Sequence, residues 1–215
     1  RPRLRVTVFS TGSELVAPGV PLGPGEIWNS NRAMLAAALS APWIELADMG
    51  AIPDEPRALA AALAGATRSA DLVISTGGVS VGDEDHMTRL FREAGGEVHA
   101  MKVAMRPGKP LAVGRLGQAI YVGLPGTPVA AYVTWQVIGA QIARRRAGHA
   151  RVAPAQVPAV ADFALERRPG RCEFRPAAFT GRDAMGRQAV RLLSASWSAR
   201  IGMLAEADGL ALIPG

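Results

Sequence analysis

Two repeating patterns of apolar and polar residues alternate along the first 146 residues of the chain. Residues 5–11 alternate between polar and apolar side chains, and residues 71–75 contain a short apolar run. Both patterns are typical of strands, and the second is apolar enough for burial on both faces. Between such runs, apolar residues recur every three to four positions, which is typical of helices that lie on a sheet. The predicted strands are residues 5–11, 43–48, 71–75, 98–105, 111–115 and 119–122, and the predicted helices start near residues 29, 52, 85 and 127.

Start signals accompany two of these helices. Asn29 or Ser30 can cap the first, because either side chain can accept a hydrogen bond from a backbone N–H of the first turn. Thr127 is a suitable cap for the last helix, and Pro128 follows at its first position, where a missing N–H costs nothing. We expect this last helix to continue to Arg146.

Strands that alternate with helices form α/β domains with a mostly parallel sheet between helical layers. We therefore predict a three-layer α/β domain for residues 1–148. Beyond it the pattern changes to short strands with glycine-rich turns, which predicts a small all-β domain for residues 149–215. Its predicted strands are residues 157–163, 172–179, 188–193 and 210–213, with one short helix near residues 199–205.

The composition is that of a globular protein, because 49% of the residues are hydrophobic and 20% are charged, which excludes a disordered chain. The single cysteine, Cys172, excludes an internal disulfide and a cysteine-based metal cluster. No uninterrupted apolar run reaches the roughly 18 residues of a membrane helix, and the first residues do not resemble a signal peptide. We expect a cytoplasmic protein without a membrane partner.

The formal net charge is +6, and the whole excess of basic residues lies in residues 144–215. A basic module can indicate nucleic-acid binding. Here the arginines are scattered apart from the run at 144–146, and the preference for arginine and alanine fits GC-rich codon usage. We therefore expect no nucleic-acid partner.

Four glycine-containing segments stand where predicted strands end, and each combines glycine with hydroxyl or charged side chains. Ligands of open α/β sheets bind outside the carboxyl ends of the strands. The structural alternative, that they are simple turns, explains one such loop better than four at one sheet edge. The segments are residues 10–15, 75–85, 105–110 and 124–128.

The second segment has the composition of a phosphate cradle. Residues 76–82 supply three glycines and two hydroxyls before a predicted helix. Glycine lets a ligand approach the backbone closely, and the N–H groups at a helix start bind anions. The segment is neither a Walker A loop nor a dinucleotide-binding Gly-x-Gly-x-x-Gly loop.

Carboxylates near these segments have functional and structural interpretations. Asp83, Glu84 and Asp85 precede a predicted helix, where acids are favourable on the surface but can also bind Mg²⁺ beside a phosphate. Glu14 follows a strand and is a candidate metal ligand, base or surface residue. Because parallel strands end at one sheet edge, we expect Glu14 and Asp85 at the mouth of the same pocket.

Basic residues stand at the third segment. Arg106 and Lys109 flank a Pro-Gly turn, and fixed cations there suit a phosphate. Lys109 stands out because the chain has only two lysines. The histidines at 86, 99 and 149 lack the spacing of metal ligands, so we expect them to be structural or surface residues.

The motifs occur in an order that resembles a known family. Residues 10–15 read Ser-Thr-Gly-Ser-Glu-Leu, and residues 25–31 read Gly-Glu-Ile-Trp-Asn-Ser-Asn. Further along, residues 77–83 read Gly-Gly-Val-Ser-Val-Gly-Asp, residues 106–110 Arg-Pro-Gly-Lys-Pro, and residues 123–128 Gly-Leu-Pro-Gly-Thr-Pro. Together they resemble the MoeA-type molybdopterin molybdenumtransferases, a family that includes the E domain of gephyrin. By position and pattern, the tail is similar to that family's small C-terminal β-barrel.

The resemblance implies a MogA-like molybdopterin-binding fold and a role in molybdenum cofactor biosynthesis. Such enzymes insert molybdenum from molybdate into adenylylated molybdopterin and release AMP, and the resemblance implies Mg²⁺ as the assisting cation and a homodimer. It implies catalytic roles for Glu14 and Asp85, and metal binding by Glu14, Asp83 and Asp85. The substrate-binding residues that it implies are Thr11, Gly12, Ser75, Gly77, Gly78, Ser80, Gly82, Arg106, Lys109, Pro125, Gly126 and Thr127.

The chain departs from the family at three positions and in length. Ser13 stands where members often have Asp, Thr127 where Asn is usual, and Gly117 in a hairpin that carries an acid in some members. Members also have roughly as much chain again before the first strand, and one domain there completes the neighbouring subunit's active site. We therefore expect this chain to be a C-terminal portion of such an enzyme.

Two alternatives to the transferase remain open. A non-catalytic molybdopterin-binding module would have lost the N-terminal half. A molybdopterin adenylyltransferase-like enzyme shares the Gly-Gly loop, but it lacks the Pro-Gly-Lys-Pro segment and the β-strand tail.

Overall fold

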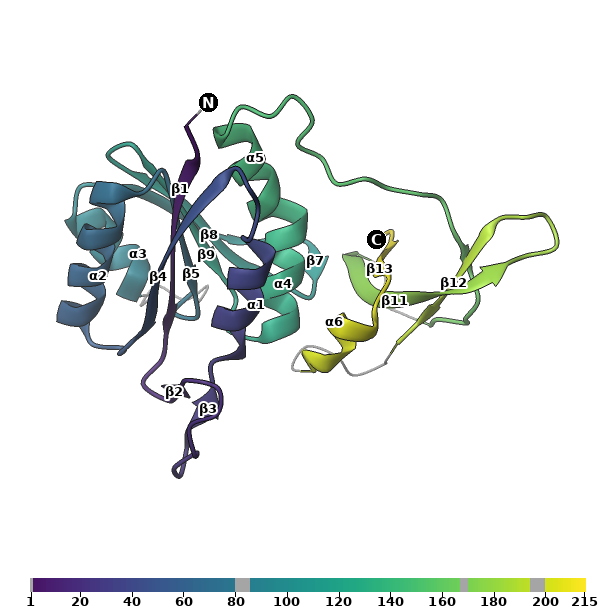
Figure 1. Ribbon diagram of the computed structural model, residues 1–215, viewed down its shortest axis with the longest axis horizontal. Helices are drawn as coiled ribbons and strands as arrows, with labels where there is room; N and C mark the ends of the chain where they lie inside the picture. Colours follow the sequence, from purple (N-terminus) through teal and green to yellow (C-terminus); the bar gives the residue numbers. More distant parts are fainter. Residues whose placement is uncertain (1, 80–85, 167–169, 194–199) are drawn as a thin grey trace.

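A computed structural model describes residues 2–79, 86–166, 170–193 and 200–215 of the chain. Within its central sheet, only β8 runs opposite to the other strands, which confirms the mostly parallel sheet predicted from the sequence. In spatial order the strands of this sheet are β4 (Ile44–Ile52), β1 (Leu4–Thr11), β5 (Leu72–Thr76), β9 (Ala119–Leu124), β8 (Pro110–Leu116) and β6 (Glu97–Lys102) (Figure 1).

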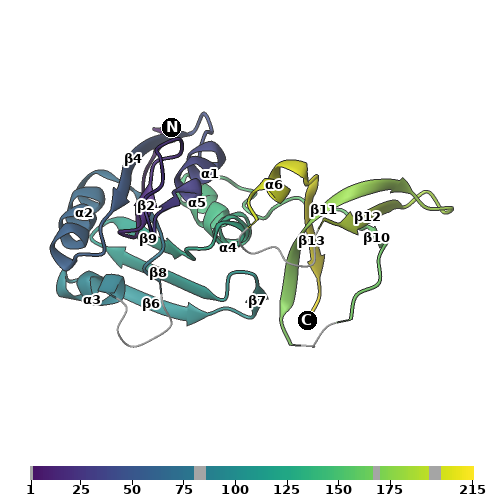
Figure 2. The same ribbon diagram turned by 90° about the horizontal axis from the view of Figure 1, so that it is seen from below.

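Helices cover both faces of this sheet, which gives the three predicted layers (Figures 1 and 2). On one face, Leu35 and Trp135 pack in the same core as Ile74 of β5, and on the other face Leu59 packs in the same core as Val73. Because β5 is buried on both faces, its sequence is an uninterrupted apolar run. The helices are α1 (Ser30–Ala38), α2 (Pro56–Ser69), α3 (His86–Glu93), α4 (Pro128–Thr134), η1 (Trp135–Gly139) and α5 (Ala140–Arg146).

The helix starts follow the predicted signals with two refinements. Asn29 caps α1, and its side chain accepts a hydrogen bond of 3.1 Å from the N–H of Arg32. Thr127 is the N-cap residue of α4, but its side chain makes no capping hydrogen bond. The helical run continues through the π-helical turn η1 to the end of α5, as predicted. Within the described ranges, no helix has the length and apolar character that crossing a membrane requires.

The residues after α5 include a second unit built around the long strand β11 (Cys172–Arg182). β11 pairs antiparallel with β12 (Gln188–Leu192) and β13 (Gly209–Ile213), and β10 (Val160–Ala161) pairs with β12. One helix of this unit, α6 (Gly202–Glu206), precedes β13. The small β domain is therefore confirmed as a fold, and the boundary between residues 148 and 149 stays a prediction.

A short strand of the first unit joins the second sheet. The strand β7 (Met105–Arg106) pairs with the start of β11, where Glu173 stands opposite Arg106 (Figure 2). Met105 belongs to an apolar cluster that contains Val129 of α4 and Met203 of α6. Strand β7 is therefore fixed in place by contacts with both units.

The structure differs from the predicted elements in four details. The helix predicted from residue 52 begins at Pro56, because β4 continues to Ile52. Residues 98–105 form β6 and a separate β7, because the chain turns where the N–H of Val103 donates to the carbonyl oxygen of Lys109. Residues 157–163 contain only the two-residue strand β10, which starts after Pro158, a residue without the N–H that a strand donates. The pair β2 (Leu15–Val16) and β3 (Ile27–Trp28) was not predicted, since two residues show no periodicity.

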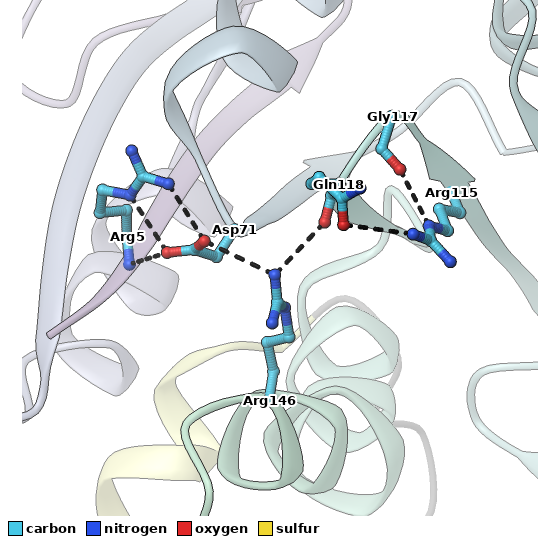
Figure 3. Close-up of polar contacts among 6 residues, drawn as sticks. All are labelled: Arg5, Asp71, Arg115, Gly117, Gln118 and Arg146. Atoms are coloured by element: carbon cyan, nitrogen blue, oxygen red, sulfur yellow. Dashed lines mark hydrogen bonds and ion pairs between the residues drawn. The ribbon is translucent and has the colours of Figure 1, made fainter. Parts of the chain in front are cut away.

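Ion pairs close the amino-terminal edge of the sheet (Figure 3). The Asp71 carboxylate accepts hydrogen bonds from the backbone N, Nε and Nη2 of Arg5, each at 3.1 Å. Nη2 of Arg146, at the end of α5, lies 3.7 Å from the same carboxylate and donates to the carbonyl oxygen of Gln118. These contacts join the starts of β1 and β5 to the end of α5.

We expect the Asp71→Asn variant to lose about 1 kcal/mol of stability at neutral pH, the upper value for a partly exposed ion pair. Hydrogen bonds from the Arg5 side chain hold the pKa of the Asp71 carboxyl below its usual value. The contribution is therefore complete above about pH 4, the pKa of an unfolded aspartate, and is lost as the pH falls through the lower folded pKa.

Urea denaturation at several pH values from neutral downward measures this effect. The variant Glu206→Gln, at an exposed residue of α6, is the control. A difference between wild type and Asp71→Asn that stays constant down to the lowest pH would contradict the assignment.

Candidate functional site

The carboxyl ends of the parallel strands lie at the sheet edge next to β2 and β3 (Figure 1). Residues at this edge line a cleft of about 810 Å³. The antiparallel strand β8 starts at this edge, so the turn between β7 and β8 reaches the cleft as well. All four segments singled out in the sequence contribute to the lining, as expected for an open α/β sheet. The predicted site residues that line the cleft are Thr11, Glu14, Gly77, Gly78, Arg106, Lys109, Pro125, Gly126 and Thr127.

Two other predicted residues lie near the cleft without lining it. Ser75 is fully buried, and its hydroxyl oxygen lies 2.7 Å from the hydroxyl oxygen of Tyr121 in the core under α2 and α3. Gly12 lies under the Glu14 carboxylate, which comes within 2.7 Å of the point where a Cβ on Gly12 would stand.

Four predicted site residues lie outside the described part of the chain: Ser80, Gly82, Asp83 and Asp85. The expected meeting of Glu14 and Asp85 at one pocket mouth therefore stays a prediction. Glu14 itself lies at the predicted edge.

Three polar or charged residues from outside the four segments also line the cleft: Asn31, Asp54 and Arg171. Asn31 lies in the first turn of α1 and ends the motif at residues 25–31, so that motif could have found it. Asp54 follows β4 at the same sheet edge, so the rule about strand ends could have found it. Arg171 precedes β11 and reaches the cleft through the pairing of β11 with β7. That pairing has no local sequence signal.

The turn that contains Gly77 and Gly78 packs against strand β1. Both adopt left-handed backbone conformations, with φ of 80° and 64°. A Cβ on Gly77 would stand 2.6 Å from the carbonyl oxygen of Thr11, and one on Gly78 would stand 2.8 Å from the Thr11 hydroxyl oxygen. These glycines therefore let the turn after β5 pack against the end of β1. The close approach of a ligand to them, expected from the sequence, stays a prediction.

Gly126 is the glycine whose missing side chain leaves space in the cleft. A Cβ there would meet only the Cα of Gly77, at an ordinary contact distance of 3.6 Å. Its carbonyl oxygen accepts a hydrogen bond of 2.7 Å from Nδ2 of Asn31. This bond ties the turn after β9 to α1.

A buried chain of hydroxyl groups fixes the strand ends under the cleft. The Thr76 hydroxyl donates to Oγ of Ser10 at 3.1 Å, and the Ser10 hydroxyl donates to Oδ1 of Asn29 at 3.1 Å. Since Asn29 also caps α1, these bonds connect β5, β1 and α1. Buried networks of this kind hold a site rigid before a ligand arrives.

Two buried polar atoms of the cleft residues have no hydrogen-bond partner among the described residues. They are Oγ1 of Thr11 and Oδ1 of Asn31, and the two residues are 5% and 7% exposed. Leaving such an atom unpaired costs about 1–3 kcal/mol. A ligand with polar groups would satisfy both.

Charges of opposite sign line the two ends of the cleft. Glu14 and Asp54 follow β1 and β4, which are neighbours at one side of the sheet. Arg106, Lys109 and Arg171 come from β7, the turn before β8 and the residue before β11. The glycine turns after β5 and β9 lie between these groups in the strand order.

The described residues contain no group of three or more histidine, cysteine or acidic side chains that could hold a metal ion. Of the predicted metal ligands, only Glu14 belongs to the described part. Glu14 and Asp54 offer carboxylate oxygens, and Mg²⁺ prefers such oxygens together with substrate phosphates. The donor types at the acidic end therefore fit Mg²⁺.

Residues 7–145 match the protein family described as "Probable molybdopterin binding domain". The chain belongs to this family. It is 40% identical over 174 residues to the molybdopterin molybdenumtransferase of Haemophilus influenzae, and 42% identical over 152 residues to that of a Nostoc species. These matches cover 80% and 69% of this chain but 43% and 35% of the relatives, so the chain spans less than half of their length. The predicted resemblance to MoeA-type proteins is confirmed.

The fold of this family member is also found in solved structures. The molybdopterin biosynthesis MoeA protein of Pyrococcus horikoshii superposes with a TM-score of 0.76 at 27% identity. The superposition covers 99% of this chain and 50% of that protein. Since it extends over both units, it supports the predicted α/β domain followed by a small β domain.

Proposed function

We propose that this chain forms the substrate-binding part of a molybdopterin molybdenumtransferase in molybdenum cofactor biosynthesis. In this role it holds adenylylated molybdopterin and molybdate while molybdenum is inserted and AMP is released. The observation that carries the proposal is the cleft, since four family motifs line it and its cations suit an anionic substrate. The names of the relatives support the same reaction.

The residues of the cleft can act on such a substrate in two ways. Arg106, Lys109 and Arg171 would hold phosphate or molybdate oxygens, because fixed cations stabilise anions without reorganising. The Thr11 hydroxyl and the Asn31 amide oxygen would bind polar groups of the same ligand. Holding two reactants in one cleft converts a bimolecular step into an effectively unimolecular one.

The acidic end of the cleft would hold the divalent cation. Glu14 and Asp54 are the described carboxylates there, and the resemblance adds Asp83 and Asp85. Bound Mg²⁺ supplies positive charge to phosphate oxygens. The catalytic roles of Glu14 and Asp85, the homodimer and the cytoplasmic location are further parts of this proposal.

The adenylyltransferase-like alternative is disfavoured by one contact. The Pro-Gly-Lys-Pro segment and the β-strand tail, which that enzyme lacks, are joined by the pairing of β7 with β11, and residues of both line the cleft. The non-catalytic alternative differs from the transferase only in turnover. Molybdenum insertion with release of AMP therefore distinguishes these two.

Binding is tested by retention of the pterin. When the chain is produced in cells that make molybdenum cofactor, we expect molybdopterin to co-purify with it, detected by fluorescence after oxidation. Protein purified without pterin from such cells would contradict the proposed binding.

We expect Lys109→Ala to weaken binding of the pterin by about 1–3 kcal/mol, the usual value of a hydrogen bond to a charged group. Lys109 is exposed and lines the cleft, so the loss should shrink as salt is added. Titration at low and high ionic strength measures both effects.

The chain's other lysine supplies the matched control. Lys102 ends β6 and is exposed outside the cleft lining, so Lys102→Ala changes the net charge equally. Equal affinities of the two variants at low salt would show that Lys109 contributes only general charge.

A further inference from the structure

A nearly buried carboxylate lies between two arginines where the units meet. Oε1 of Glu173 lies 3.6 Å from Nη1 of Arg106, and its Oε2 lies 3.9 Å from Nε of Arg175. The Glu173 and Arg175 side chains are each 8% exposed, whereas the Arg106 side chain is 55% exposed. Glu173 therefore connects a buried cation with a cation that lines the cleft.

The backbone holds this arrangement in register. β11 pairs with β7 so that Glu173 stands opposite Arg106. The N–H of Cys172 donates to the carbonyl oxygen of Ala104 at 3.1 Å, and Met105 is buried in the cluster between the units. The backbone at Glu173 is thus already fixed, so less conformational entropy is lost when its carboxylate pairs with the long Arg106 side chain.

We propose that Glu173 is a positioning residue of the cleft, which orients the Arg106 guanidinium toward the bound anion. Glu173 belongs to the second unit and does not line the cleft itself. It affects ligand binding through the position of the Arg106 side chain. The inference rests on the proposed function, because it assumes that the cleft binds an anionic ligand.

Two effects of neutralising Glu173 oppose each other. Removing a negative charge beside a basic cleft attracts anions more strongly in general. Without the carboxylate, however, Arg175 and Arg106 face each other as like charges, and repulsion drives the exposed guanidinium away from its position. The second effect dominates, because Arg175 already compensates the Glu173 charge and Arg106 is free to swing into solvent.

A double-mutant cycle with inorganic pyrophosphate as the probe tests this inference. By calorimetry, we expect Glu173→Gln to bind the probe about three- to tenfold more weakly than wild type, the usual coupling of residues in contact. In the Arg106→Ala background the same substitution should change the affinity less than about twofold. A purely structural role would give equal losses in both backgrounds.

A second variant separates the effect of the carboxylate's position from the effect of its charge. Glu173→Asp keeps the charge next to Arg175 but shortens the reach to Arg106, so we expect it to weaken binding in the same direction. Thermal unfolding of each variant identifies losses that come from the fold. Tighter binding by Glu173→Gln, or wild-type binding by Glu173→Asp, would overturn the proposal.

The affinity of Lys109→Ala for pyrophosphate distinguishes a failure of the proposed function from a failure of the role proposed for Glu173. If Lys109→Ala and wild type bind pyrophosphate equally, the proposed anion-binding function of the cleft fails, and this inference fails with it. If Lys109→Ala binds more weakly and Glu173→Gln binds like wild type, only the role of Glu173 is refuted.

Discussion

Replacing Gly126 by valine is expected to reduce retention of molybdopterin strongly while leaving the protein folded. The turn at Gly126 lines the cleft, and a Cβ there would touch only the Gly77 Cα, at 3.6 Å. The backbone of Gly126 does not adopt a positive φ, so the substitution causes no strain. The added methyl groups would occupy space that the ligand needs.

The size of this effect follows from the cost of overpacking. Forcing extra methyl groups against a bound molecule costs about 1–3 kcal/mol, so affinity should fall about fivefold to more than a hundredfold. The alanine variant should show a smaller loss. Pterin fluorescence after purification and a titration with pyrophosphate measure the change.

Gly209→Val is the control for this prediction. Gly209 begins β13 in the second unit, and a Cβ there would meet nothing within 4 Å. We expect this variant to bind the pterin like wild type. Normal retention of pterin by Gly126→Val would show that the ligand lies elsewhere on the molecule.

The largest loss of stability is expected for Gly77→Ala. With φ at 80°, alanine at this position pays about 1–2 kcal/mol for a left-handed conformation. Its Cβ would also stand 2.6 Å from the backbone oxygen of Thr11, which cannot move without displacing β1. Overpacking of this kind costs about 1–3 kcal/mol, so we expect a total loss of about 2–5 kcal/mol.

Gly117→Ala separates the two contributions. Gly117 has a similar φ of 60°, but a Cβ there would meet nothing within 4 Å. Its loss should therefore stay near the conformational cost alone, about 1–2 kcal/mol. Urea denaturation of both variants measures the difference, and equal losses would mean that the contact with Thr11 is relieved at no cost.

The sheet edge explains why much of the candidate site was predictable. The carboxyl ends of parallel strands meet at one edge, so Glu14 after β1 and Gly126 after β9 are brought together whatever their side chains do. Lys109 joins them because β8 runs antiparallel and starts at that edge. For these residues a mostly parallel sheet was sufficient, and the alternation of strands and helices predicts such a sheet. The order of the strands was not predicted from the sequence.

Side-chain direction was not predictable in the same way. Ser75 stands one residue before the cleft residue Thr76, yet its hydroxyl is buried against Tyr121 on the other face of the sheet. Successive side chains of a strand point to opposite faces of the sheet. A motif of consecutive residues therefore includes side chains from both faces. The motif therefore grouped a core residue with residues of the cleft.

The sequence by itself determined the α/β layers, because periods of two and near four reflect which faces of strands and helices are buried. It also determined the edge at which the glycine-rich segments meet. Only the tertiary structure decided that Gly77 packs against Thr11, that Arg171 reaches the cleft and that Glu173 stands beside Arg106. These contacts join residues far apart in the chain. The positions of Arg171 and Glu173 depend on how β11 docks against β7, and that of Gly77 depends on how the turn after β5 packs against β1. No local pattern of residues exists for either.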